Sequence, residues 1–320
     1  MKYVFGAAAL ACAVMAGPAI AQDYPSRPIT MIVPYTPGGA TDIIGRVIAE
    51  GLRGQLGQSV IVENVAGAGG SVGALQASRT QPDGYTILMG ALTSHSINMN
   101  LTPPPGFDLT TDFETAGLAG FVPLALVTRP GFEADDVAGL IEMAKAAPGE
   151  LTYASSGAGS PQHLGMEMLK DMAGLDIVHV PYQGSSPAVT DLMGGHVDVM
   201  IDTVPSILPS VSGGGLRVLG VATQEPSPFL EGVPTIASGG VEGFEVVSWF
   251  GVLLPKGTPD AVADRLNTAI NAVLTDDEVL AALNRQGVVP APGSRADQAG
   301  RMQAEIEKWR GVIAAAGPME

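Results

Sequence analysis

Short apolar runs of strand character alternate with longer amphipathic runs along most of the chain, and this alternation limits the folds that the chain can adopt. Strands are predicted over residues 29–33, 59–63, 86–89, 151–155, 177–180, 197–201 and 216–222. Helices are predicted where apolar side chains recur every three to four positions, over residues 43–52, 71–79, 136–146, 164–172, 186–193, 259–273, 277–283 and 295–314. Such an order favours an α/β fold in which helices cover mainly parallel sheets.

Two apolar segments, 118–127 and 246–254, are long enough to cross from one lobe to another. They predict two lobes joined by paired strands, with a discontinuous first lobe of residues 22–122 plus 247–320 and a second lobe of residues 123–246. A ligand cleft is expected between the lobes, because open α/β sheets bind ligands outside the carboxyl ends of their strands.

The first 21 residues have the pattern of a signal peptide. Lys2 precedes an apolar run, 4–16, that is too short to span a membrane, and Ala19-Ile20-Ala21 is an Ala-x-Ala site with cleavage expected after Ala21. The only cysteine, Cys12, lies in this segment. Export and a mature chain without cysteine fit a periplasmic protein held together by its core rather than by disulfides.

The charge of the chain excludes some partners. Without the first 21 residues, 15 basic residues face 32 acidic ones. A net charge of this sign argues against nucleic acid and anionic membrane surfaces as partners. It also repels an anionic ligand, so local donors would have to overcome the overall field.

The glycine-rich segment 34–42 joins a predicted strand to a predicted helix. A turn of this kind presents backbone N–H groups and the positive end of a helix dipole, which together form a seat for an anion. Similar polar loops recur at 93–96, 155–160 and 182–186, and none of the four loops contains Lys or Arg. If the ligand is a carboxylate, we expect backbone N–H groups, hydroxyls and water to hold it instead of an arginine fork.

The sequence gives less support to a hydrolase or a metal-binding protein. Ser71 lies in Gly69-Gly70-Ser71-Val72-Gly73, which matches the nucleophile elbow of serine hydrolases, but no histidine follows His196 to complete a triad. The four histidines are scattered without ligand spacing, so no metal site is expected. We predict that the chain is not an enzyme and needs no cofactor.

Several polar residues allow two interpretations. Asp42 is interpreted as the partner of Arg46 at i,i+4, with recognition of a ligand amine as the alternative, and Asp202 at a strand end is equally ambiguous. His179 is interpreted as a hydrogen-bonded core residue, whereas His163 in the first turn of a helix is a candidate for the cleft. Helix starts are predicted at Ser160-Pro161, Ser186-Pro187 and Thr258-Pro259, and Thr275 with Glu278 as a capping box.

The chain resembles the periplasmic receptors of tripartite tricarboxylate transporters, the Bug-type solute-binding proteins. The matching segments lie in order along nearly the whole mature chain, at 24–29, 33–39 with Asp42, 63–64, 67–70, 82–86, 153–157, 159–160 with His163, 179–182, 194–198, 233–235 and 255–259. The resemblance implies a two-lobed Venus-flytrap fold of the type II periplasmic-binding-protein class. It also implies that the lobes close on a small carboxylated solute, which is then delivered to a membrane permease without chemical change.

The resemblance also implies the residues that form the site. Two loops are expected to clasp the ligand carboxylate, and other residues to form the wall. The implied set is Tyr35, Thr36, Gly38, Gly39, Ala40, Thr41, Thr93, Ser94, His95, Ser155, Ser156, Gly157, Ser160, His163, Tyr182, Gly184, Asp202 and Thr203. Dicarboxylates, tricarboxylates, aromatic acids and acidic amino acids all remain possible ligands, and a monomer is expected.

Two alternatives stay open from the sequence. One is an exported hydrolase that uses Ser71. The other is a sensory receptor that binds the same solute and presents it to a membrane kinase. Trp249 and Phe250 are expected to influence the size of the pocket, and the sequence favours packing at the hinge as the role of Trp249.

Overall fold

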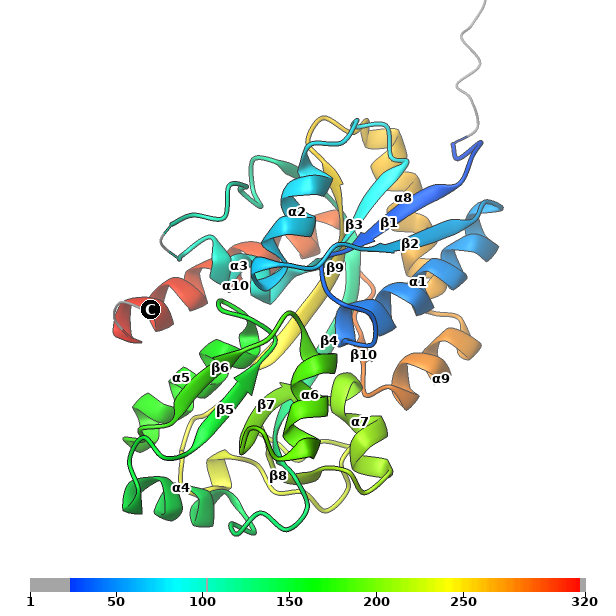
Figure 1. Ribbon diagram of the computed structural model, residues 1–320. Helices are drawn as coiled ribbons and strands as arrows, with labels where there is room; N and C mark the ends of the chain where they lie inside the picture. Colours follow the sequence, from blue (N-terminus) through cyan, green and yellow to red (C-terminus); the bar gives the residue numbers. More distant parts are fainter. Residues whose placement is uncertain (1–23, 102, 317–320) are drawn as a thin grey trace, which may run out of the picture.

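The computed structural model describes residues 24–101 and 103–316, and within them the chain forms two lobes (Figure 1). The predicted cleavage site lies outside the described residues. In the first lobe, the parallel strands β2 (Val60–Asn64), β1 (Ile29–Val33) and β3 (Thr86–Ala91) lie side by side. The sheet continues through β9 (Val247–Pro255), antiparallel to β3, to β4 (Phe113–Thr128).

The second lobe is built on the other end of β4. There β4 pairs antiparallel with β7 (Val199–Thr203) and β8 (Arg217–Val221). Parallel strands β5 (Thr152–Ser155) and β6 (Val178–Pro181) extend the sheet beyond β7. The short β10 (Val289–Pro290) pairs with the middle of β4. The two long apolar segments are therefore paired strands that connect the lobes, and the predicted two-lobed α/β fold is confirmed.

Helices cover both sheets, as Figure 1 shows. The first lobe carries α1 (Ala40–Leu56), α2 (Ser71–Ser78), α3 (Leu92–Asn98), α8 (Asp260–Val273) and α9 (Asp277–Arg285). The second carries α4 (Val137–Ala146), α5 (Pro161–Ala173), α6 (Ser185–Gly194) and α7 (Val204–Ser212). No described helix combines the length and the apolar character needed to cross a membrane.

Four helix starts test the cap predictions. Ser160 caps α5 as predicted and accepts a hydrogen bond from the His163 N–H. The other three predictions are wrong because a neighbouring residue takes the cap position. Gly184 precedes α6, Pro259 precedes α8, and the Asp276 carboxylate accepts from the Glu278 and Val279 N–H groups at α9.

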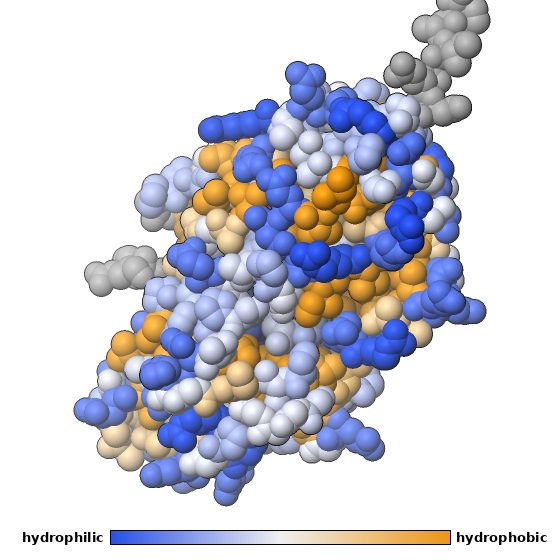
Figure 2. Space-filling model, turned by 45° about the vertical axis from the view of Figure 1, so that its right-hand side comes forward, coloured by the Kyte–Doolittle hydropathy of each residue, from blue (hydrophilic) through white to orange (hydrophobic). Residues whose placement is uncertain are grey.

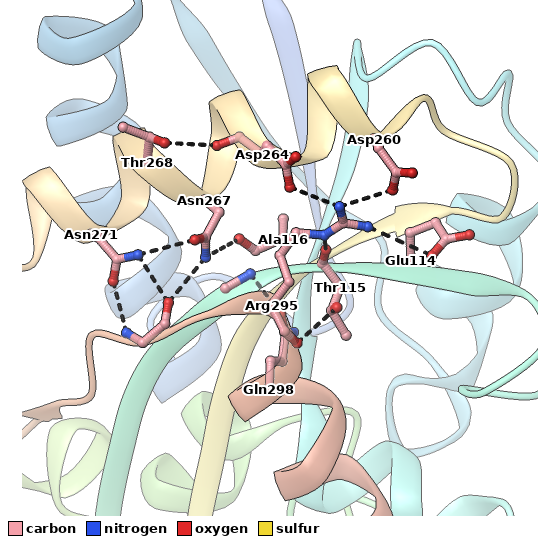
Figure 3. A network of polar contacts seen from close by, with 12 residues as sticks. Glu114, Thr115, Ala116, Asp260, Asp264, Asn267, Thr268, Asn271, Arg295 and Gln298 are labelled. Atoms are coloured by element: carbon pink, nitrogen blue, oxygen red, sulfur yellow. Dashed lines mark hydrogen bonds and ion pairs between the residues drawn. The ribbon is translucent and has the colours of Figure 1, made fainter.

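The last helix, α10 (Arg295–Ala316), joins the two lobes. Its first turn is held by a polar network on the first lobe (Figure 3), in which Arg295 donates to the Thr115 carbonyl and pairs with Asp260 and Asp264. Further along the helix, Trp309 is completely buried in the core of the second lobe. The helix therefore lies across the junction of the lobes.

Candidate functional site

A cavity lies between the two lobes, and both lobes line it. The space between its walls measures about 390 Å³, and this figure includes solvent outside the cavity, so the enclosed part is much smaller. Figure 2 shows pale, weakly polar residues across the waist of the molecule, between the lobes. The residues that line the cavity are Tyr35, Gly39, Ala40, Thr41, Ala91, Thr93, Ser94, Ser156, Pro161, Gln162, Ser185, Thr203, Ser248, Trp249 and Phe250.

Tyr35 forms part of the first-lobe wall. Its hydroxyl donates to the Gly69 carbonyl at 2.7 Å and lies 2.5 Å from the Ser94 hydroxyl. Burial raises the pKa of Tyr35, and the nearby charge of Asp202 adds to this effect, so the ring carries a neutral hydroxyl. The wall is therefore polar without being charged.

The turn before α1 is shaped by Asp42. The carboxylate accepts from the Gly38 N–H and the Asn64 amide and pairs with Arg46. Burial opposes ionisation, but these hydrogen bonds outweigh it and lower the pKa of Asp42. The predicted pairing with Arg46 is confirmed, and Asp42 fixes the conformation of the turn that presents Gly39 and Ala40 to the cavity.

Two stacked histidines support the loop 155–160 of the second lobe. The rings of His163 and His179 stack with centroids 4.1 Å apart. His179 Nε2 is 2.7 Å from the Ser155 hydroxyl, and His163 Nδ1 accepts from the Gly159 N–H. Burial lowers the pKa of both rings, that of His179 to about 4, so both are neutral near pH 7. The hydrogen bond predicted for His179 is confirmed, but the predicted core position is wrong, because His179 is only half-buried on the outer strand β6, and His163 lies behind the loop.

The lobes touch each other across the cavity. The Ser186 hydroxyl donates to the Pro37 carbonyl at 2.8 Å, and the Ala40 N–H donates to the Ser206 hydroxyl at 2.9 Å. A Cβ atom on Gly69 would lie 2.6 Å from the Ala158 carbonyl oxygen. The structure is therefore a closed form, and one of the N–H groups expected for an anion is already occupied by Ser206.

The structure brings together eight of the predicted site residues on the cavity wall: Tyr35, Gly39, Ala40, Thr41, Thr93, Ser94, Ser156 and Thr203. The other ten do not line it. They are Thr36, Gly38, His95, Ser155, Gly157, Ser160, His163, Tyr182, Gly184 and Asp202. Among them, Tyr182 donates to the Asp191 carboxylate, and His95 packs edge-on against Phe107.

Five wall residues were not among the implied site residues: Ala91, Pro161, Gln162, Ser185 and Ser248. Trp249 and Phe250, which were expected to influence the size of the pocket, also line it. Ser185 lies within the predicted cleft loop 182–186 and Gln162 follows the loop 155–160 by two positions, so both could have been included on that ground. Trp249 both lines the cavity and stacks under the Arg301 guanidinium, 4.0 Å from its ring centre. It therefore belongs to the wall as well as to the hinge.

Two buried polar atoms at the site lack a hydrogen-bond partner in the described part of the chain: the Ser156 hydroxyl and Asp202 Oδ2. Buried polar atoms are nearly always paired in native proteins. Ser156 lines the cavity, and Asp202 is held by residues that line it. A bound molecule or water would satisfy both atoms.

The alternative chemistries find no support in the site. The Ser71 hydroxyl is buried and accepts from the Asn98 amide, so a general base does not occupy that position. Within the described residues there is no group of three or more histidine, cysteine, aspartate or glutamate side chains that could hold a metal ion.

Comparison with known proteins identifies the family. Residues 44–317 match the model of the tripartite tricarboxylate transporter family receptor. The chain belongs to this family. It is 38% identical over 309 residues to protein BugT of Bordetella pertussis, covering 96% of this chain and 95% of that protein.

Two relatives have solved structures with a carboxylate ligand. The R. palustris protein Rpa4515 with adipate has a TM-score of 0.90 and 37% identity, over 92% of this chain and 100% of that one. MatC from Rhodopseudomonas palustris with bound malate has a TM-score of 0.86 and 30% identity, over 90% and 99%. The tripartite tricarboxylate receptor family consists of solute-binding proteins, so the predicted family, fold and lack of enzymatic activity are confirmed.

Proposed function

We propose that this receptor captures a small carboxylated solute between its lobes in the periplasm and delivers it to the permease of a tripartite tricarboxylate-type transporter. The cavity lined by both lobes carries the proposal. A solute that contacts both walls stabilises the closed form over the open one, which is how hinge-closing receptors work.

The chemistry of the wall favours a carboxylate. Residues with hydroxyl groups line the cavity together with the N-terminus of α1: Thr93, Ser94, Ser156, Ser185 and Thr203. The Ser156 hydroxyl has no partner in the described part of the chain, whereas those of Thr93, Ser94 and Ser185 already donate to protein oxygens. In the described part of the chain, none of the lining residues is Lys or Arg. Neutral donors and a helix terminus would bind the carboxylate directly or through water, without an arginine fork.

Four parts of the proposal rest on the sequence alone. They are cleavage after Ala21, action as a monomer, the lobe boundaries at 122/123 and 246/247, and a permease as the partner. Among the ten predicted site residues that do not line the cavity in the closed form, those in the two loops would act by shaping them: Thr36, Gly38, Ser155, Gly157 and Ser160.

A thermal-shift screen tests the proposal. Residues 22–320 are heated with aliphatic di- and tricarboxylates, aromatic acids and acidic amino acids after removal of co-purified ligand. At about 100 times the dissociation constant, a bound acid adds roughly 2.7 kcal/mol to the free energy of unfolding. A raised midpoint with one class of acid is expected, and the absence of a shift with every acid would contradict the proposal.

A further inference from the structure

Asp202, at the end of β7, is a completely buried carboxyl whose two oxygens have different surroundings. Oδ1 accepts from the Gln162 amide at 2.7 Å, the Ser185 hydroxyl at 3.0 Å and the Thr203 N–H at 2.7 Å. Oδ2 is buried and has no partner among the described residues. The carboxyl group is therefore fixed through one oxygen, and the other oxygen is left available.

The available oxygen belongs to the binding site and not to a remote core. Gln162, Ser185 and Thr203, which hold Oδ1, all line the cavity. Tyr35, on the opposite wall, is close enough for the charge of Asp202 to contribute to its raised pKa, after the larger effect of burial. Asp202 does not itself line the cavity, so a solute between Tyr35 and these second-lobe residues would reach Oδ2 through a bridging water molecule.

The groups that face Asp202 do not neutralise it. Gln162 comes from α5, Ser185 from α6 and Thr203 from the turn into α7, and none of them titrates. The facing Tyr35 titrates only at high pH because burial raises its pKa. Burial is also the main effect on Asp202 and raises its pKa to about 6, against the hydrogen bonds that oppose this rise.

An ionised carboxylate with an unfilled acceptor position prefers a donor. A hydroxyl or ammonium group on the solute would supply the missing hydrogen bond, whereas a methylene group would leave Oδ2 unpaired. A second carboxylate at the same place would be repelled by like charge.

We propose that Asp202 is a specificity-determining residue that selects solutes bearing a hydroxyl or ammonium group in addition to their carboxylate. The receptor would then prefer hydroxy- or amino-substituted acids over the unsubstituted acid of the same length. This inference rests on the proposed function, since it concerns the same cavity.

Calorimetric titration with matched acids tests the inference. Succinate, malate and aspartate share a four-carbon dicarboxylate skeleton and differ only in the hydrogen, hydroxyl or ammonium group on one carbon. The test compares them at pH 7.5 with the mature protein, together with the longer pair adipate and 2-hydroxyadipate. At least one substituted acid is expected to bind roughly tenfold or more tightly than its unsubstituted counterpart.

The substitution Asp202→Asn gives the sharper result. The amide carbonyl can keep the contacts made by Oδ1, while the NH₂ group replaces the acceptor Oδ2 with a donor. For the ammonium-bearing acid the preference is expected to reverse, because an ammonium group cannot accept from the Asn NH₂, whereas the hydroxy acid can accept from it and should keep part of its affinity. Asp171→Asn, at an exposed position near the end of the same α5 that carries Gln162, is the matched control and should leave the preference unchanged.

The pH dependence supplies a readout that does not require the variant to fold. If Oδ2 accepts from the solute, the preference for the substituted acid declines as the pH falls through about 6 and Asp202 becomes protonated. A preference for the substituted acid that stays constant or grows as the pH falls below about 6 would overturn the inference, because an ionised Oδ2 could not then be its source.

The outcomes separate the two proposals. Equal binding of substituted and unsubstituted acids, unchanged in Asp202→Asn, would overturn the role of Asp202 and leave the carboxylate receptor intact. Binding of no acid by the wild-type protein would overturn both.

Discussion

At the residue scale, closure of the lobes depends on glycines where the two backbones meet. Gly69 adopts a left-handed conformation with φ of 59°, and a Cβ atom there would lie 2.6 Å from the Ala158 carbonyl oxygen of the other lobe. Since a carbonyl oxygen of the backbone cannot turn aside as a flexible side chain can, the lobes would have to separate to admit a methyl group.

The variant Gly69→Ala is therefore expected to weaken binding of the solute roughly tenfold or more, because overpacking of this kind costs about 1–3 kcal/mol. Gly57→Ala is the matched control, since its φ is 68° and no atom lies within 4 Å of the added Cβ. Both variants are destabilised to a similar extent, because alanine adopts a left-handed backbone conformation only with strain. Calorimetric titration measures the difference, and equal affinities for the two variants would show that this contact does not limit closure.

Individual residues also show how far the site could be predicted. The first loop and Thr203 were found because they follow strands, which places them at the ligand edge of a sheet. The sequence indicated that Trp249 and Phe250 influence the size of the pocket, but it favoured packing at the hinge for Trp249, because β9 is buried along its length and a continuous apolar run does not reveal which side chain faces a cavity. The position of His163 could not be predicted either, because it depends on stacking with His179, which lies 16 positions further along the chain.

At the element scale, α10 connects the two lobes. Arg295 and its partners fix the start of the helix on the first lobe (Figure 3), and Trp309 lies in the core of the second. The Glu305 carboxylate accepts hydrogen bonds from both the Trp309 indole and the Thr93 hydroxyl, which lines the cavity. The helix therefore connects the core of the second lobe to the wall of the cavity.

Replacing the anchor of α10 should destabilise the whole protein. Trp309→Ala is expected to lower the free energy of unfolding by about 3–5 kcal/mol, the usual loss for a large buried aromatic side chain. Glu307→Ala, on the exposed face of the same helix, should cost less than about 1 kcal/mol because it removes a surface ion pair with Arg310 and an exposed hydrogen bond from Gln303. Urea denaturation measures both variants, and a small loss for Trp309→Ala would mean that the second lobe is stable without α10.

Most elements were predictable from the sequence, and the exceptions have physical reasons. The predicted strand at 29–33 coincides with β1, and α1 extends its prediction by one turn or less at each end. The helix α7 was missed because Pro205 and Pro209 are typical of loops, although one lies in the first turn and the other is tolerated inside this short helix. The helix α3 was missed because Thr93, Ser94 and Ser96 form helices poorly without tertiary contacts.

At the scale of the whole molecule, the net charge of −16 opposes the approach of an anionic solute. The neutral wall of the cavity acts only at short range, whereas the repulsion acts over a Debye length. Salt should therefore speed association, in contrast to receptors with basic clefts.

The association rate constant of a dicarboxylate is expected to rise severalfold when salt increases from about 10 to about 100 mM, since the Debye length shortens from roughly 30 to 10 Å. A monocarboxylate should show a smaller rise. Stopped-flow fluorescence can follow binding, because Trp249 lines the cavity whereas Trp309 is buried in the second core. A rate that falls with salt would reveal an attractive local field at the entrance.

Because β3 pairs with β9, the sheet of the first lobe is completed late during synthesis of the chain. Leu88 lies beside Leu253 in the sheet, so the first three strands lack their neighbour until more than 150 further residues have been synthesised. The second lobe can assemble its strands earlier, yet its core receives Trp309 only near the end of the chain. Both cores are thus finished by segments that lie late in the chain, and a prematurely terminated chain would expose two incomplete cores to proteases instead of forming a half-active receptor.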